Sequence, residues 1–328
     1  MKRRTLAIYL TLALSIVLGI STVTWREKRS MNKSVSEDLE KKIIIGATLA
    51  SEDSEYLKLV SVYMKEAAQE KGVELILEYA NWDAQVQSKQ IDSFIEREVD
   101  AIILCPINAK SMLTPLKKVK KANIPVINLN MQVDAVSSQY IATYVGASSS
   151  EEAALAAQLF IDTLGEEGGE IAIIEGAPGS DAQIFRTQTF LEKLTAYPKI
   201  EIVSIENGNW NRNKAKLIMT DLMRKHPHLK GVFSHDSNMA MGVVEALEAL
   251  EVDRNLYIVG ISEKEEYLEA LRQKRLYGII TQPPDYEGKY SVYCAIMAAQ
   301  GITLRPWYKD PIQILTHENV DSFKMTME

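Results

Sequence analysis

The sequence predicts an α/β protein with two lobes, each built on a doubly wound parallel sheet. From residue 43 onward, short apolar runs alternate with segments of helical spacing, which is the rhythm of βαβ units. The apolar runs are near-continuous, as expected of strands that are buried on both faces. About four such units precede residue 146 and about five follow it, which is more than one sheet comfortably holds. We therefore expect two sheets, one in each lobe, joined by crossing segments.

The elements of the first half follow one another in a regular order. Leu57, Val60 and Met64 share one face of the first helix, which ends at Gly72. Asn81 or Asp83 can cap the second helix. Strands are predicted at 42–50, 73–80, 100–106, 124–130 and 140–146, and helices at 56–71, 84–98 and 109–122.

The second half repeats this order. Ser237 or Asn238 can cap the helix at 238–250, and Asp285 can cap the last helix, which follows a double proline. Strands are predicted at 170–176, 199–207, 231–234, 256–262 and 277–282, and helices at 151–164, 183–196, 212–225, 238–250, 263–273 and 285–300.

The N-terminal region differs in composition from the rest of the chain. Residues 5–25 carry no charge and are flanked by basic residues on both sides. As a helix this stretch reaches roughly 30 Å, enough to span a bilayer core. We expect an uncleaved membrane anchor over 1–29, although Gly19-Ile20-Ser21 offers a passable site for cleavage as a secretory signal. Residues 30–42 are polar and predict a stalk, and either interpretation places the globular part outside the cytoplasm.

Composition and motifs exclude several classes of function. The net charge of −7 does not indicate a nucleic-acid-binding surface. Cys105 and Cys294 are interpreted as buried thiols, because without a CxxC pair they indicate neither a disulfide framework nor a metal knuckle. The His-Pro-His segment at 226–228 lacks further ligands, and the glycine-rich segment 175–186 matches neither phosphate-binding loop pattern. We expect no metal and no cofactor.

The candidate site lies in the polar loops that follow the strands, because doubly wound sheets bind ligands beyond the carboxyl ends of their strands. In SHDSN (234–238), Asp236 is a candidate hydroxyl-binding carboxylate, whereas the Ser-His-Asp trio is too extended to form a catalytic relay. Gln282 precedes the double proline and is free to offer a donor and an acceptor to hydroxyl groups. Trp210 would be out of place as a core residue among Asn and Gly, and it suits stacking on a sugar ring.

Six segments carry a resemblance to a known family: VDAIILCP (99–106), ANIPVINLN (122–130), YVGASS (144–149), HPHLKGVFSHDSNMAMGVVEAL (226–247), LYIVGIS (256–262) and ITQPPDYEGKYSV (280–292). From about Lys42 to its end the chain resembles the type I periplasmic sugar- and solute-binding proteins, of which ribose-binding protein is the best-known member. The resemblance implies two lobes, joined by a three-segment hinge, that close on a small ligand. We expect lobe 1 to comprise 43–146 and 283–311, and lobe 2 to comprise 147–282 and 312–328.

The same resemblance implies a set of ligand contacts. Tyr56 and Trp210 fall where the family has aromatic residues, and Arg186 matches a recurrent arginine. Asp236 and Gln282 match polar ligands of the family. The implied contacts are Tyr56, Asn130, Arg186, Trp210, Asp236, Ser262 and Gln282.

Four positions depart from the family pattern. Asn130 and Ser262 stand where aspartates are usual, and Met131 and Ile184 stand where arginines are usual. Charge-assisted hydrogen bonds are roughly twice as strong as neutral ones, so these changes predict weakened or redirected sugar binding. The ligand is then an unusual pentose or hexose, a different polyol, or another small polar signal.

Closure of the two lobes on a ligand can have one of two functions. The closed form either delivers its ligand to an ABC-type importer or is presented to a membrane sensor such as a histidine kinase, and an uncleaved anchor favours the sensor. A regulator of the lactose-repressor type would need a helix-turn-helix where this chain has its apolar span. An enzyme acting on a polyol is the remaining alternative, but we expect none, because the loops offer no nucleophile–base pair.

Overall fold

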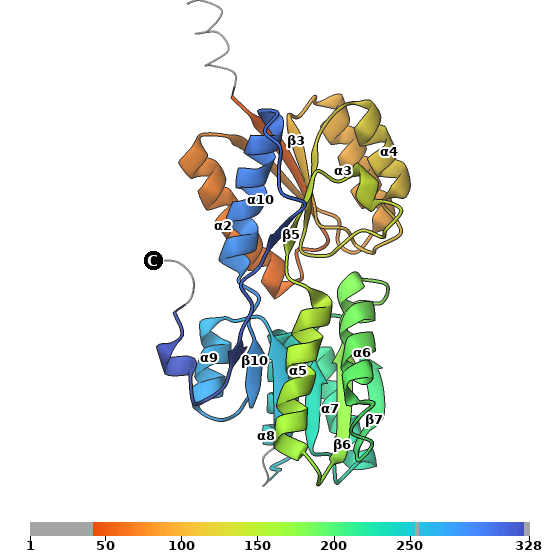
Figure 1. Ribbon diagram of the computed structural model, residues 1–328, viewed down its shortest axis with the longest axis vertical. Helices are drawn as coiled ribbons and strands as arrows, with labels where there is room; N and C mark the ends of the chain where they lie inside the picture. The colour runs from red at the N-terminus through yellow and green to blue at the C-terminus, as the bar shows by residue number, and fades with distance from the viewer. Residues whose placement is uncertain (1–41, 253–255, 325–328) are drawn as a thin grey trace, which may run out of the picture. The chain divides into compact units, whose positions relative to one another are not determined.

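The strands of the chain form two separate sheets in the computed structural model, which describes residues 42–252 and 256–324 (Figure 1). The first sheet has the order β11-β5-β4-β3-β1-β2, and all its neighbouring strands are parallel. Its crossovers run outward from β1 in both directions, so it is doubly wound, as predicted. Its strands are β1 (Ile44–Leu49), β2 (Glu74–Tyr79), β3 (Ala101–Leu104), β4 (Val126–Leu129), β5 (Thr143–Gly146) and β11 (Trp307–Lys309).

The second sheet has the order β12-β10-β9-β8-β6-β7. Its strands are parallel except for β12, which pairs antiparallel with β10. The parallel sheet predicted from the sequence therefore carries an antiparallel edge strand, a common addition to doubly wound sheets. Its strands are β6 (Gly169–Glu175), β7 (Ile200–Asn207), β8 (Gly231–Ser234), β9 (Tyr257–Ile261), β10 (Gly278–Ile280) and β12 (Ile314–Leu315).

Helices cover both faces of the first sheet, α2 and α10 on one and α3 and α4 on the other (Figure 1). Neighbouring residues of β3 show the division: Ile103 packs with Met64 of α2 and Cys294 of α10, whereas Ile102 packs with Phe94 of α3. Successive side chains of a strand point to opposite faces, so a continuous apolar strand feeds two cores. The helices are α2 (Glu55–Lys71), α3 (Ala84–Glu96), α4 (Leu113–Lys121) and α10 (Pro284–Ala299).

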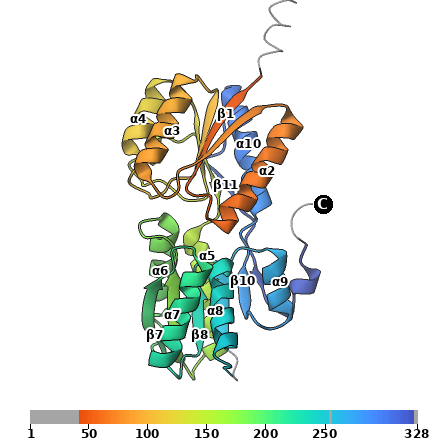
Figure 2. The same cartoon turned by 180° about the vertical axis from the view of Figure 1, so that it is seen from behind.

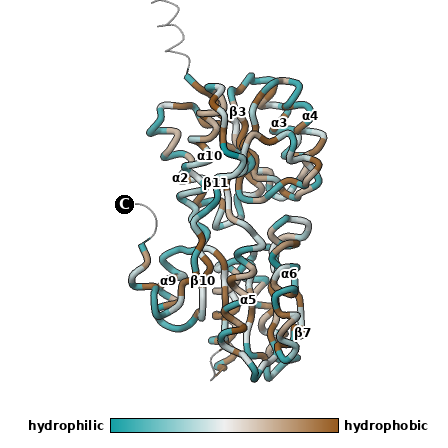
Figure 3. Tube along the Cα trace, in the orientation of Figure 1, coloured by the Kyte–Doolittle hydropathy of each residue, from teal (hydrophilic) through white to brown (hydrophobic). Residues whose placement is uncertain are grey.

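The second sheet is covered in the same way, with α5 and α6 on one face and α7, α8 and α9 on the other (Figure 2). Phe233 of β8 stacks on Phe190 of α6, with the ring centroids 4.5 Å apart, while the preceding Val232 packs with Met219 of α7. Apolar residues recur along α5 and β10 (Figure 3). The helices are α5 (Ser149–Leu164), α6 (Asp181–Leu194), α7 (Arg212–Lys225), α8 (Ser237–Ala249) and α9 (Glu265–Arg272).

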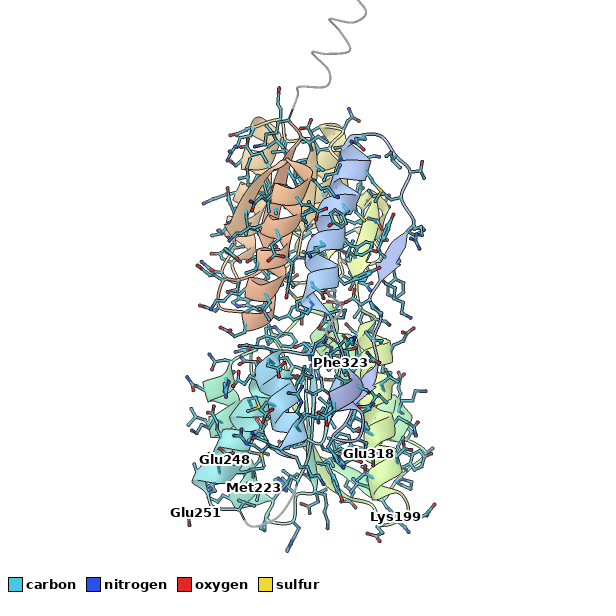
Figure 4. The ribbon with its side chains drawn as sticks, turned by 90° about the vertical axis from the view of Figure 1, so that its left-hand side faces the viewer. Lys199, Met223, Glu248, Glu251, Glu318 and Phe323 are labelled. Carbon is cyan, nitrogen blue, oxygen red and sulfur yellow. The ribbon has the colours of Figure 1, made fainter. Side chains whose placement is uncertain are left out.

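The described part of the chain passes between the two sheets from β5 to α5, from β10 to α10 and from β11 to β12. The last passage leads to the short helix η2 (Val320–Ser322), after which Phe323 packs against the same core as Met223 of α7; both side chains are labelled in Figure 4. The residue-level lobe boundaries given above stay a prediction.

Two local predictions are wrong and one is confirmed. The helix expected from residue 109 begins only at Leu113, because the Asn108 side chain accepts the N–H groups of Lys110 and Ser111 at 3.1 and 2.9 Å and holds a turn there. Asp285 lies inside the first turn of α10, whose N-cap is Pro283 and has no side-chain cap bond. Asp83 caps α3 as predicted, accepting N–H groups at 2.8 and 3.2 Å.

Among the described residues, no helix is both long and apolar enough to cross a bilayer. The predicted anchor at 1–29, and the stalk at 30–42 except for its last residue, lie outside the described residues.

Candidate ligand-binding site

A cavity lies between the carboxyl ends of strands from both sheets, within the compact unit formed by residues 43–328. The structure brings all seven predicted contact residues together in its walls. That these side chains bind a ligand stays a prediction. They are Tyr56, Asn130, Arg186, Trp210, Asp236, Ser262 and Gln282.

Turns at strand ends place most of these side chains. Asn130 follows β4, Asp236 lies just beyond β8, Ser262 follows β9, and Gln282 lies just beyond β10. Asn130 and Ser262 have φ values of 59° and 79°, so the backbone leaves both strands through the left-handed region. The topology thus explains why residues far apart in the sequence meet at one edge of each sheet.

Arg186 of α6 forms a buried ion pair with Glu152 of α5. Its Nε and Nη2 groups donate to Oε2 of Glu152 at 3.0 and 2.8 Å, and the two side chains are 5% and 0% exposed. Nη1 donates to the carbonyl of His235 at 2.5 Å, and Nη2 also donates to Oε1 of Gln282 at 3.3 Å. Burial raises the pKa of Glu152, and the guanidinium opposes that rise. Four contacts therefore fix the guanidinium at the cavity wall.

Glu152 also lines the cavity, and sequence reasoning missed it. An acidic residue in the first turn of a helix is typical of an exposed helix end, where it favours the helix dipole. The sequence contains no local signal that this carboxylate is buried against an arginine 34 positions away.

Glu287 of α10 is a second buried carboxylate, which orients two amides of the site. Asn130 donates through Nδ2 to both Glu287 oxygens at 3.1 and 2.9 Å, and Gln282 donates through Nε2 at 3.1 Å. Burial raises the pKa of Glu287. The prediction that Gln282 is free is therefore wrong: its nitrogen donates to Glu287, and its oxygen accepts from Arg186.

Asp236 is the N-cap of α8, a role that the sequence assigned to Ser237 or Asn238. Its extended backbone, with φ of −144°, places Oδ1 2.6 Å from the N–H of Met239. Ser237 instead donates to the carbonyl of Ser262 at 2.7 Å. Burial raises the pKa of Asp236 to about 6. The carboxylate therefore serves both the helix end and the cavity that it lines.

The Ser-His-Asp trio does not form a relay. Ser234 donates to the backbone carbonyl of Asp236 at 2.8 Å, and the His235 ring lies 3.4 Å from the N–H of Gly176. Burial, with the nearby charge of Arg186, lowers the pKa of His235 well below its ordinary value. The imidazole is thus a neutral part of the core beneath the cavity.

Two tryptophans line the cavity, and the sequence pointed to one of them. Trp210 partly packs against the core of the second sheet, so the prediction that it does not contribute to a core is wrong. Its ring covers Gly176 so closely that an added Cβ would lie 1.9 Å from it. Trp82, which was missed, precedes α3 and is partly buried. The available signal was the repeated Asn-Trp-Asx sequence at 81–83 and 209–211.

Contacts also bridge the two lobes beside the cavity. The N–H of Ala109, after β3, donates to the carbonyl of Gly179, before α6, at 3.3 Å. Lys264, after β9, lies 3.8 Å from Glu55 at the start of α2. These pairs tie loops of one lobe to loops of the other, and opening of the cavity requires that they separate.

Residues 45–303 match the family model described as a periplasmic binding protein domain. The chain is similar to the ribose import binding protein of Bacillus subtilis, with 22% identity over 316 residues, covering 96% of this chain and 100% of that protein. It is also similar to the xylitol-binding protein of Mycolicibacterium smegmatis, with 29% identity over 258 residues and coverages of 77% and 72%.

A solved structure extends this result to the fold. An ABC transporter solute binding protein from Bacillus halodurans with bound myo-inositol superposes with a TM-score of 0.81 at 28% identity, covering 86% of this chain and 96% of that one. The resemblance predicted from the sequence is confirmed. This chain belongs to the periplasmic binding protein domain family, in the type I, ribose-binding-protein-like group.

Proposed function

We propose that this chain is an extracytoplasmic receptor that binds one small polar ligand, a monosaccharide or a cyclic polyol, between its two lobes. The observation that carries the proposal is the cavity, whose polar side chains are held in place by buried partners and whose other walls include three aromatic residues. A sugar or cyclitol has matching features, with hydroxyl groups at its edge and apolar C–H groups on its faces. Relatives named for ribose and xylitol, and a similar structure holding myo-inositol, support this ligand class.

The charges of the cavity argue against anionic ligands. Arg186 is neutralised by Glu152, and Asp236 adds a further carboxylate to the walls. A sugar acid or sugar phosphate would have to give up its hydration for a wall without a free positive charge, which is costly. We therefore expect the hydroxyl groups of the ligand to donate to Asp236 and Asn130 and to accept from Arg186.

Closure of the lobes is the output of the receptor in this proposal. The contacts of Ala109 with Gly179 and of Lys264 with Glu55 form only when the lobes are together, so a ligand that bridges the cavity favours the closed form. The closed form is presented to a membrane partner, either an ABC permease or a sensor kinase. Mature protein that retains residues 1–21 would support the anchored sensor. The named relatives are binding proteins, which supports a receptor rather than an enzyme acting on a polyol.

A thermal-unfolding screen against pentoses, hexoses, polyols and their amino derivatives tests this function. A ligand that binds only the folded chain, at about 100 times its dissociation constant, adds about 2.7 kcal/mol of stability. We expect at least one polyol to raise the Tm of the wild-type chain and to lose this effect in Asp236→Ala. Asp83→Ala is the matched control, because it also removes a helix cap but does not line the cavity. The absence of a shift with every sugar, polyol and amino derivative would refute the proposed function.

A further inference from the structure

The buried charges of this chain are strongly unbalanced. Among the described residues, one guanidinium, that of Arg186, is buried together with six carboxylates; these belong to Glu152, Asp181, Glu263, Asp285, Glu287 and Asp310. Glu152 lines the cavity, and all six lie at or next to the ends of helices or strands. A buried carboxylate is costly unless positive charge or hydrogen bonds compensate it.

Helix N-termini compensate part of this excess. Glu152, Asp181, Asp285 and Glu287 lie in the first turns of α5, α6 and α10, where the helix dipole favours negative charge. Glu263 and Asp310 lie outside helices, and Asp310 interacts with Glu287, which raises the pKa of Asp310 beyond the effect of burial. Burial also raises the pKa of Glu263 to about 8 and those of Asp181 and Glu287 to about 7, so protonation offsets part of this charge. In the cavity wall itself Arg186 offsets Glu152, which leaves the carboxylate of Asp236 without an ion-pair partner among the described residues.

Three side chains of the cavity wall keep acceptor atoms that the described part of the chain does not use. Oε1 of Glu152 is buried and has no partner, although Oε2 of the same carboxylate holds Arg186. Asp236 uses Oδ1 for its helix cap, and Asn130 uses its Nδ2 group for Glu287, which leaves an oxygen of each without a protein partner in the described part of the chain. On the donor side, Arg186 already uses four of its five N–H groups. The ligand therefore has to bring donors to these acceptors.

Aromatic rings form much of the remaining wall. Tyr56, Trp82 and Trp210 line the cavity together with Glu152 and Asp236. Aromatic faces attract cations through the ring quadrupole, most strongly for Trp, and they also accept the C–H faces of a sugar. A wall of carboxylates and aromatic rings suits an ammonium group that is attached to a polyol ring.

We propose that the ligand of this cavity carries a protonated primary amine, as an amino sugar or an aminocyclitol does. The inference rests on the proposed function, since it adds a charged group to the polyol. The ammonium lies on the side lined by Glu152 and Asp236, supplies N–H donors to their unpaired oxygens, and balances the charge of Asp236. The hydroxyl groups of the ring occupy the rest of the site, near Asn130, Ser262 and Arg186.

Titration calorimetry with matched ligand sets tests the proposal on the purified protein. Each set contains a neutral parent, its monoamino-deoxy derivatives and their N-acetyl forms, with D-ribose, D-xylose, D-glucose, D-galactose and myo-inositol as parents. We expect at least one amine to bind ten times more tightly than its parent and its N-acetyl form. Asp236→Asn keeps the helix cap and should weaken binding of that amine at least tenfold more than it weakens any binding of the parent. Asp83→Asn, the same change at another cap, should change neither.

The outcomes separate the two proposals. If a neutral parent binds as tightly as, or more tightly than, every amine, the amine is refuted and the polyol receptor stands. If an amine is preferred equally by wild type and Asp236→Asn, the assignment of the ammonium to the Asp236 side is refuted. If no member of any set binds, both the receptor function and the amine are refuted.

Discussion

Trp82 and Trp210 occupy corresponding positions in the two lobes and line the same cavity. Each follows an Asn that also lies in the left-handed region, with φ of 62° for Trp82 and 58° for Trp210, and each precedes the residue that caps the next helix. Each also follows the edge strand of its sheet, β2 or β7. A bulky residue in this backbone region is strained, which indicates that the ring position matters more than local stability.

Replacing either tryptophan should separate binding from stability. Loss of one ring removes an aromatic contact worth about 0.5–1.5 kcal/mol beyond its buried area, so we expect Trp82→Gly to bind the ligand at least about fivefold more weakly. Because Gly relieves the left-handed strain, Trp82→Gly should unfold at a higher temperature than Trp82→Ala. Calorimetric titration and thermal unfolding measure the two effects. Tyr197→Ala, at a surface position outside the cavity, should leave affinity unchanged, and equal affinities for wild type and Trp82→Gly would contradict the role of this ring.

The buried ion pair predicts a large difference between two neighbouring glutamates. Glu152→Ala leaves the Arg186 guanidinium buried without its partner, and breaking such a pair typically costs about 3–5 kcal/mol. Glu151→Ala is the matched control, because Glu151 pairs with Lys309 at the surface, where such pairs contribute about 0–1 kcal/mol. Urea unfolding of both variants measures the free energies. Similar values for the two would show that Glu152 does not compensate Arg186.

Sequence periodicity predicted the fold well because each βαβ unit is encoded locally. The continuous apolar runs, the helical stripe around Val60 and the caps are properties of short segments. The cavity walls could also be located, because parallel strands end at one edge. The buried residues that hold the wall side chains in place could not be predicted. Glu287 holds Asn130 from 157 positions away, and only the assembled lobe shows that Gln282 is shared between Glu287 and Arg186.

Hydrogen bonds from side chains to the nearby backbone explain the smaller errors in the predicted helix ends. The Asn108 side chain holds a turn at a position where a helix was predicted. Asp236, and not Ser237 or Asn238, caps α8 because its extended backbone directs the carboxylate toward the N–H groups at the helix end. Trp82 was overlooked because a single aromatic after a strand is not distinctive. Its equivalence to Trp210 becomes visible only when the two lobes are compared.

The buried acids predict a loss of stability as the pH rises. Burial raises the pKa of Glu263 from 4.5 to about 8, and the charges of Asp285 and Glu287 add to that rise. Between these two values the folded chain keeps a proton that the unfolded chain has released, so the stabilisation present below pH 4.5 disappears as the pH approaches about 8. Burial also raises the pKa of Asp181, to about 7, which acts in the same direction.

Glu263→Gln isolates the contribution of this residue. Glutamine keeps an acceptor for the N–H of Gln282, which the carboxylate accepts at 2.7 Å, but it cannot ionise. We expect the free energy of unfolding, measured in urea between pH 5 and 8, to fall less steeply with pH in the variant than in the wild type. Glu265→Gln, at the exposed start of α9, should leave the slope unchanged. A wild-type slope that persists in Glu263→Gln would show that other carboxylates, with Glu287 and Asp310 the first to test, hold the protons.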